Sequence, residues 1–264
     1  MSTLLELYDD QLRAAAEVSD APELTRIGPL WAATFPLRRR GFLSYSRIGP
    51  DEDLAGLVSA AVDHYEADER VDRFEWKTRG HDALPELPQL LTAHGFTLEE
   101  QETVMAGNVS AAITAGAPLP LGYRMERCCD EATLREAEAL AGRVFEDSPE
   151  DSRRMADELV ARRREAPDSF EMWLVRSPQG QVVCSGRVDF VADSDFAGLW
   201  GGACDEDHRA RGLYRALTAQ RARWARRQGK SFLHSDCTEF SRPILQRAGL
   251  QSITTTTPAV WRRG

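Results

Sequence analysis

DEDHRARGLYRAL, residues 205–217, follows a run of strand-type residues at 196–204 and leads into a helical pattern that extends to about residue 228. A turn between a strand and a helix directs backbone N–H groups outward, and the helix dipole adds partial positive charge there. Such a turn binds phosphate groups. Gly212 keeps a side chain away from this backbone, while Arg209 and Arg211 add bidentate donors. The spacing leaves two interpretations open: an anion site, or a solvated turn with ordinary helix-start residues.

The composition is typical of a globular protein and narrows the class of partner. The chain has 264 residues, of which 42% are hydrophobic and 28% are charged. The net charge of −9 argues against general nucleic-acid binding, which requires a basic surface. Apolar runs stay shorter than a bilayer span, and the acidic, helix-patterned N-terminus differs from a signal peptide, so no membrane partner is predicted.

The cysteines and histidines favour neither a disulfide framework nor a metal site. The five cysteines form no C-x-x-C pair, and an odd number leaves one over from any set of bridges. We therefore expect buried thiols in a reduced, cytoplasmic chain. His64, His81 and His94 lack metal-ligand spacing, and we expect them to be structural or solvated.

The chain divides most naturally at residues 109–122, which are small, rich in Pro and Gly and almost uncharged. This predicts an N-terminal domain at 1–108, a linker at 109–122 and a second domain at 123–264. The two halves contain segments with the same order of elements. Residues 74–107 and 232–261 share one layout, namely a strand, a polar loop, a Pro-started helix that ends at a Gly, and a further strand. This repeat suggests a duplicated unit whose first copy is incomplete.

Residues 209–214 resemble the Gln/Arg-x-x-Gly-x-Gly/Ala signature of the GCN5-related N-acetyltransferase (GNAT) superfamily. Arg209 and Gly212 match, whereas Tyr214 stands where Gly or Ala is usual. Residues 238–250 also align with the family's Asn-x-x-Ala-x-x-x-Tyr-x-x-x-Gly-Phe helix, with Thr238 at the Asn position. The resemblance covers residues 123–264 well and the first half loosely. It implies an α/β (α+β) fold of the GNAT type, with a mixed central sheet flanked by helices, in a tandem arrangement with an incomplete N-terminal copy.

The resemblance also implies acetyl-CoA as the cofactor. Strand residues would pair with the pantetheine arm, turn residues would hold the pyrophosphate, and the acetyl group would pass directly to the amine of a small molecule. The residues implied in cofactor binding are Gly202, Ala203, Cys204, Arg209, Ala210, Arg211, Gly212, Leu213, Tyr214, Arg215 and Thr238. A homodimer is one further expectation.

The catalytic groups are less clear, because Leu245 stands where the family often has a tyrosine acid. Acyl transfer needs a neutral amine, an oxyanion donor and an acid for the leaving thiolate. The candidate bases are His234, Asp236 and Glu239, and strand alternation places the first two on one face. The alternative is a polar strand end with a capping network around Asp236 and Thr238. Trp200 is a candidate wall of the acceptor pocket.

Three functions stay open at this point. The first is an active N-acetyltransferase acting on a small amine. The second, suggested by Leu245, is an acyl-CoA-binding pseudoenzyme or sensor without turnover. The third, by fold-level analogy alone, is a tandem enzyme that acylates a specialised sugar amine or thiol precursor.

Overall fold

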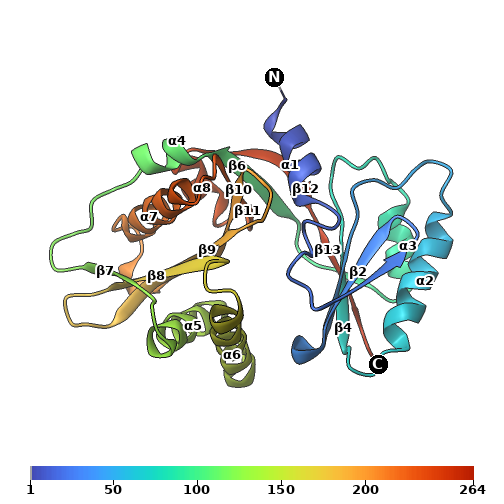
Figure 1. The fold of residues 1–264 in the computed structure, drawn as a ribbon, viewed down its shortest axis with the longest axis horizontal. Helices are drawn as coiled ribbons and strands as arrows, with labels where there is room; N and C mark the ends of the chain where they lie inside the picture. Colours follow the sequence, from blue (N-terminus) through green and yellow to red (C-terminus); the bar gives the residue numbers. More distant parts are fainter. Residues whose placement is uncertain (1) are drawn as a thin grey trace. The chain divides into compact units, whose positions relative to one another are not determined.

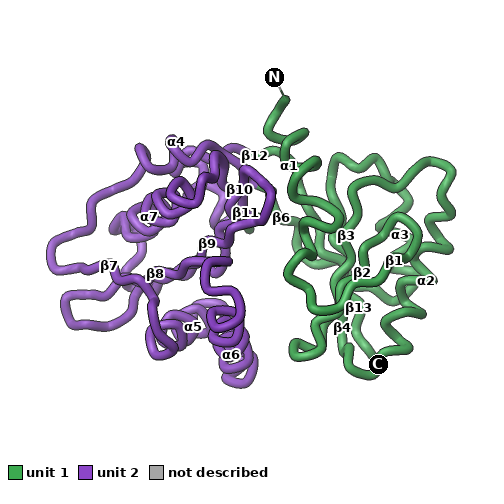
Figure 2. Tube along the Cα trace, viewed as in Figure 1, with its two compact units in different colours: residues 1–104, 236–239, 252–264 green, residues 105–235, 240–251 purple. Residues whose placement is uncertain are grey.

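The computed structural model describes residues 2–264, which form two compact units (Figures 1 and 2). Unit 1 consists of Met1–Val104, Asp236–Glu239 and Ser252–Gly264. Unit 2 consists of Met105–Ser235 and Phe240–Gln251. The chain forms two mixed sheets with flanking helices, which confirms the predicted fold class.

The first sheet contains the C-terminal strand of the chain between two strands from its first half. The strand order is β1-β2-β3-β4-β13-β5. β13 is antiparallel to β4, with Ala259 opposite Trp76, and it also pairs with β5. β3 and β4 run parallel. The strands are β1 (Glu23–Ile27), β2 (Leu30–Phe35), β3 (Arg40–Ser44), β4 (Arg73–Lys77), β5 (Thr97–Leu98) and β13 (Pro258–Arg262).

Three α-helices and one short 3-10 helix complete unit 1. They are α1 (Leu4–Leu12), η1 (Pro36–Arg38), α2 (Leu54–Glu66) and α3 (Leu87–Ala93). α2 follows β3 and α3 follows β4 along the chain. The core is aromatic-rich, with Tyr65 stacked on Phe74 at 4.4 Å between ring centroids. Asp53 caps α2 by accepting a hydrogen bond from the Gly56 N–H at 2.9 Å.

The second sheet has the order β12-β6-β11-β10-β9-β8-β7. β7 to β10 form an antiparallel meander, and β10 then pairs in parallel with β11. The strands are β6 (Glu102–Asn108), β7 (Arg124–Arg127), β8 (Phe170–Arg176), β9 (Val182–Phe190), β10 (Phe196–Cys204), β11 (Phe232–Cys237) and β12 (Leu250–Thr256).

Helices cover both faces of the meander in unit 2 (Figure 1). One face carries α7 (Leu213–Arg227) with α4 (Val109–Thr114), and the other carries α5 (Glu131–Phe145) with α6 (Pro149–Glu165). Apolar α7 residues such as Leu213 and Leu217 pack on Val175 and Val183 of the sheet. The remaining elements are η2 (Glu206–His208) and α8 (Arg242–Arg247).

The compact units differ from the predicted domains. The predicted linker at 109–122 begins with α4, whose residues Val109 and Ala112 are buried. The Asn108 side chain caps this helix by accepting a hydrogen bond from the Ser110 N–H at 2.9 Å. The hydrophobic periodicity of α4 is weak, because the helix is short and consists mostly of small residues. Its contact with α7 stabilises a helix that the amino-acid composition does not predict. The C-terminal strand also falls in unit 1, because β13 completes the first sheet.

Candidate functional site

The parallel strands β10 and β11 pair only at their beginnings. Phe196 to Gly198 lie opposite Phe232 to His234, and β10 then continues alone on this side as far as Cys204. The Ser235 hydroxyl donates a hydrogen bond to the Leu199 carbonyl at 2.9 Å, just past the last ladder pair. Beyond this point the backbone of β10 presents an edge to which an extended ligand can add as a strand.

A β-bulge bends β10 where this edge begins. On the side of β9, Trp200 pairs with Arg187 and Ala203 pairs with Ser185, so Gly201 and Gly202 together face the single residue 186. Gly201 has φ +57°, a conformation that favours glycine. A bulge re-aims backbone groups and increases the local twist. The bulge lies in the part of β10 that extends past its ladder with β11.

The turn after β10 leaves the start of α7 without a side-chain cap. Gly212, with φ +81°, is the N-cap of α7 and supplies no side-chain cap. Side chains of Thr3, Asp53, Asp130 and Ser148 cap α1, α2, α5 and α6. Within residues 2–264, α7 is therefore the exception among helices of nine residues or more. Its first-turn N–H groups have no acceptor within the helix and carry the positive end of the dipole.

The arginines of the turn are held by carbonyl oxygens. Arg209 Nε donates to the Cys204 carbonyl at 3.2 Å, and its guanidinium lies 5.5 Å from the ring centroid of Phe240. Arg211 donates to the Asp207 carbonyl at 3.1 Å and to the Tyr123 hydroxyl at 3.4 Å. Asp205 caps the short helix η2, so its carboxylate is used away from the start of α7. The two guanidinium groups of the turn are thus fixed by neutral oxygen atoms.

Tyr214 lies against the bulge. A β-carbon at Gly202 would be 2.3 Å from the Tyr214 hydroxyl oxygen, so a larger residue at this position would require the Tyr214 ring to move. The guanidinium of Arg221, which is fully buried, lies 5.3 Å from the centroid of the Tyr214 ring. Arg221 donates to the Arg187 carbonyl at 3.2 Å and thereby ties α7 to β9 below the bulge.

The structure gives the three candidate bases different surroundings. His234 is 8% exposed and contacts the rings of Trp200 and Phe196, with centroid distances of 5.5 Å and 6.1 Å. Asp236 belongs to unit 1 and forms an ion pair with Lys77. Glu239 is exposed and accepts a hydrogen bond from the Thr103 hydroxyl at 3.4 Å. A carboxylate that holds a buried lysine argues for a structural role of Asp236 rather than proton transfer.

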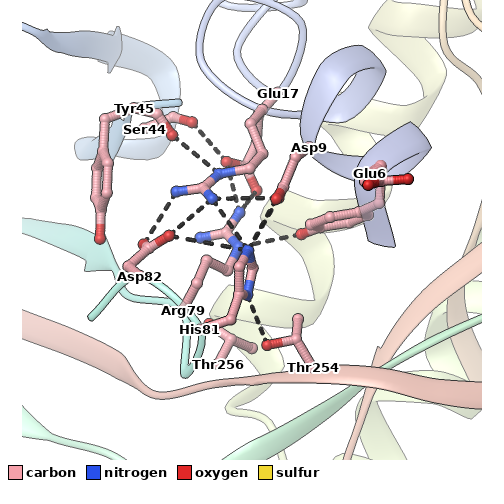
Figure 3. A network of polar contacts seen from close by, with 12 residues as sticks. Glu6, Asp9, Glu17, Ser44, Tyr45, Arg79, His81, Asp82, Thr254 and Thr256 are labelled. Carbon is pink, nitrogen blue, oxygen red and sulfur yellow. Dashed lines mark hydrogen bonds and ion pairs between the residues drawn. The ribbon is translucent and has the colours of Figure 1, made fainter. Parts of the chain in front are cut away.

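Lys77 and Asp236 are part of a buried charge network that the sequence did not reveal. Glu17 accepts hydrogen bonds from Arg79 at 2.6 Å and 2.8 Å and from the Ser44 hydroxyl at 2.6 Å (Figure 3). It also pairs with Lys77 at 3.0 Å. Burial acts to raise the pKa of Glu17, but the charges of Arg79 and Lys77 outweigh it and hold that pKa well below its usual range. Burial acts to lower the pKa of Lys77, but Asp236 and Glu17 raise it overall.

A second polar cluster in unit 1 fixes α1 (Figure 3). Arg13 forms a bidentate contact with Asp82 at 2.8 Å and 3.0 Å and donates to the Tyr45 carbonyl at 3.1 Å. His81 lies 3.0 Å from Asp9 and 2.8 Å from the Thr254 hydroxyl. These residues are widely separated in the sequence and carry no motif, so no sequence signal could have found either network.

The structure also places the remaining sequence-predicted features. Thr238 is exposed, and it belongs to the segment Asp236–Glu239 of unit 1. Leu245 is 1% exposed in α8, so its apolar side chain is a core residue. A cavity of about 390 Å³ lies in unit 1, bordered by residues such as Tyr45, Thr78 and Asp82, and no predicted cofactor residue lines it.

Residues 2–264 contain no helix long and apolar enough to cross a membrane. Within the same described residues, no group of three or more His, Cys, Asp or Glu side chains is placed to hold a metal ion.

Comparisons with known proteins agree on the fold. No protein-family model matches the sequence, and no curated protein does. Among solved structures, a GCN5-related N-acetyltransferase from Kribbella flavida matches with a TM-score of 0.72 and 16% identity, covering 99% of this chain and 95% of that one. One from Sphaerobacter thermophilus matches with a TM-score of 0.61 and 17% identity, over 89% and 78% of the two chains.

A tandem GNAT protein from the clavulanic acid biosynthesis pathway matches along nearly the whole chain. The TM-score is 0.63 at 13% identity, with 98% of this chain and 95% of that chain covered. Identities this low establish the fold and no more. The chain thus has the fold of the GCN5-related N-acetyltransferases across both of its sheets.

Proposed function

We propose that the protein is an acyl-CoA-dependent N-acetyltransferase that transfers an acetyl group from acetyl-CoA directly to the amine of a small molecule. The observation that carries this proposal is the uncapped start of α7 beside a bulged β10 whose ladder with β11 ends early. An open helix N-terminus fits a pyrophosphate, and an open strand edge fits the amide-containing pantetheine arm. The fold shared with named acetyltransferases supports the same assignment.

The residues of the turn fit the cofactor without rearrangement of side-chain caps. Backbone N–H groups of residues 210–215 would hold the pyrophosphate, with Arg209 and Arg211 as flanking cations. The main chain of Gly202, Ala203 and Cys204 would pair with the pantetheine arm. Acetyl-CoA would supply the activated thioester.

His234 is the base that the geometry favours. It lies where β10 and β11 part, beside Trp200, whereas Asp236 holds Lys77. In this proposal His234 accepts the proton of the attacking amine, Trp200 forms one wall of the acceptor site, and a backbone N–H of the bulge donates to the developing oxyanion. The rings of Phe196 and Trp200 contact His234, which suits an acceptor with an apolar part next to its amine.

One observation favours a second function, an acyl-CoA sensor without turnover. The α8 position expected to carry the acid is Leu245, which is buried and cannot donate a proton. A binding protein would need the open turn but no acid. Turnover above the rate of hydrolysis separates the two functions.

We further propose that the first sheet is an incomplete second copy of the GNAT unit. β3 and β4 are parallel neighbours connected through α2, just as β10 and β11 are connected through α7. The difference lies at the helix start, where Asp53 caps α2 with a carboxylate. The incomplete copy would shape the protein without binding a nucleotide of its own.

Calorimetry with acetyl-CoA, followed by a panel of small amines with chromatographic detection of released CoA, tests the proposal. We expect His234→Gln to lower turnover by about 10²–10⁴-fold while acetyl-CoA binding stays unchanged. The substitution should also remove the fall in rate at low pH that comes from protonation of the base. His64→Gln, on α2 of unit 1, is the matched control and should leave both unchanged. Failure of the wild-type protein to bind acetyl-CoA would disprove both candidate functions.

A further inference from the structure

Two cysteines face each other on neighbouring strands of unit 2. Cys204 at the end of β10 lies directly opposite Cys184 of β9 in the antiparallel ladder. The adjacent pair is hydrogen-bonded, because the Asp205 N–H donates to the Val183 carbonyl at 2.9 Å. The cysteines therefore occupy a non-hydrogen-bonded position, where opposed Cα atoms are about 4.5 Å apart and side chains share one face. That separation lies within the range that disulfides span.

The two thiols already interact. Cys184 is fully buried, Cys204 is half-buried, and both pack in one apolar cluster with Leu213 and Leu217. The neighbouring Cys184 thiol lowers the pKa of Cys204, burial opposes the effect, and the positive charge of Arg209 assists the lowering. The neighbouring Cys204 sulfur and burial both raise the pKa of Cys184. The pair thus contains one half-buried sulfur with a lowered pKa and one buried thiol directly opposite it on the neighbouring strand.

The pair adjoins the turn that would hold the pyrophosphate. The carbonyl of Cys204 accepts a hydrogen bond from Arg209 at 3.2 Å, and the chain continues directly into η2 and the start of α7. Any covalent change at the Cys204 side chain acts on the strand end that positions Arg209.

We propose that Cys184 and Cys204 are a reversible redox modification site that closes to a cross-strand disulfide and thereby weakens cofactor binding. The oxidant is a low-molecular-weight disulfide. The Cys204 thiolate attacks one of its sulfurs, forming a mixed disulfide and releasing one thiolate. The Cys184 sulfur, after losing its proton, attacks the Cys204 sulfur and releases the second thiol. The protein dithiol is oxidised by two electrons, and one disulfide is reduced to two thiols.

Peptide mapping of the full-length protein after treatment with glutathione disulfide tests the bond itself. Trypsin yields residues 177–187 and 188–209 as the peptides that contain Cys184 and Cys204, while the other cysteines fall in residues 128–135 and 231–247. We expect the first two peptides to be linked before reduction and separate after treatment with dithiothreitol. Free thiols at both positions, or glutathione on Cys204 without a link to Cys184, would overturn the proposal.

Variants distinguish this bond from general thiol oxidation. Cys184→Ser and Cys204→Ser should each abolish the link. Cys129→Ser, which removes an exposed cysteine outside the pair, should leave the link intact. Persistence of a link in Cys184→Ser would show that another cysteine is the partner of Cys204 and would contradict the assignment.

The effect on the cofactor rests on the proposed function and is measured separately. Acetyl-CoA, which has no free thiol, is titrated into oxidised and reduced protein. We expect oxidation to raise its dissociation constant about tenfold in the wild-type protein and to have no effect in Cys184→Ser. Equal affinity of the two wild-type forms would refute the regulatory part. If neither form binds acetyl-CoA, the proposed function fails, and the peptide map still decides whether the disulfide forms.

Discussion

Helices α2 and α7 follow strands of parallel pairs in their respective sheets, yet they begin in opposite ways. α2 starts with Asp53, whose carboxylate accepts a hydrogen bond from the Gly56 N–H. α7 starts with Gly212, whose positive φ turns the chain without offering a side-chain acceptor. One residue thus decides whether the start of the helix is capped by a side chain or leaves its backbone N–H groups open to an anion.

The same contrast holds for the charges around each connection. In unit 1, Lys77 and Arg79 are buried with the carboxylates of Glu17 and Asp236. In unit 2, Arg209 and Arg211 donate hydrogen bonds to carbonyl oxygens and a tyrosine hydroxyl. The cations of unit 1 are thus paired with carboxylates, whereas those of the turn in unit 2 contact neutral oxygen atoms.

The largest effect is expected from breaking the buried ion-pair network of unit 1. Lys77→Met leaves the buried carboxylates of Glu17 and Asp236 without their lysine. Removing one partner of a buried ion pair costs about 3–5 kcal/mol. We expect a loss of that size in the free energy of unfolding, measured by urea titration. The control is Arg39→Met, which breaks a half-exposed pair with Asp72 and should cost far less. Similar losses in the two variants would show that the network is not a special stabilising element.

The next largest effect is expected from giving α7 a side-chain cap, which its start lacks. Gly212→Asp would give α7 a carboxylate at its start, as α2 has, and would repel a pyrophosphate. We expect the dissociation constant of acetyl-CoA to rise about 100-fold, or about 2.7 kcal/mol. Gly212→Asn has a similar shape without the charge and should weaken binding less. Unchanged affinity in Gly212→Asp would show that the cofactor does not bind at this turn.

Acid should weaken unit 1 through Glu17. The folded-state pKa of Glu17 is held low, because Arg79 and Lys77 outweigh burial. Its ion pairs therefore contribute fully above the unfolded value of about 4.3 and are lost as the pH falls through the folded pKa. We expect Glu17→Gln to lower stability near neutrality and to make the acid limb shallower by up to about 1.4 kcal/mol per pH unit. Urea titrations between about pH 3 and 7 measure this limb. Parallel acid limbs in the two proteins would contradict this role for Glu17.

The smallest effect is expected at the cap of α2. Asp53→Ala removes the acceptor for the Gly56 N–H and should cost about 1 kcal/mol. Thermal unfolding should report this loss, and calorimetry should show unchanged acetyl-CoA affinity. The start of α2 is already capped by Asp53, so we expect it to bind no ligand. A clear change in acetyl-CoA affinity would contradict this expectation.

Local patterns predicted the turn and its neighbours well. The end of β10 at Cys204 and a helix that stops before Gly229 follow from strand composition, helical periodicity and glycine placement. These features depend on residues close together in the chain, which periodicity and cap chemistry describe directly. The bulge at Gly201 and Gly202 was not predicted, because a bulge depends on the register with β9.

The base candidates show where local patterns fail. His234 and Asp236 both lie on β11, but strand alternation cannot supply their partners. Lys77 comes to Asp236 from a position 159 residues away, and Trp200 comes to His234 from the neighbouring strand. Contacts of this kind arise from strand pairing and packing and leave no spacing in the sequence.

By itself, the sequence determined the strand–turn–helix connection at 205–217, because backbone geometry there depends on a glycine and its immediate neighbours. The tertiary structure alone decided that the C-terminal strand completes the first sheet and that Cys184 lies opposite Cys204. It also assigned Asp236 to an ion pair with Lys77 of β4. The physical reason is common to all three: long-range pairing is selected by the burial of whole sheet faces and buried charges, and no short segment records that choice.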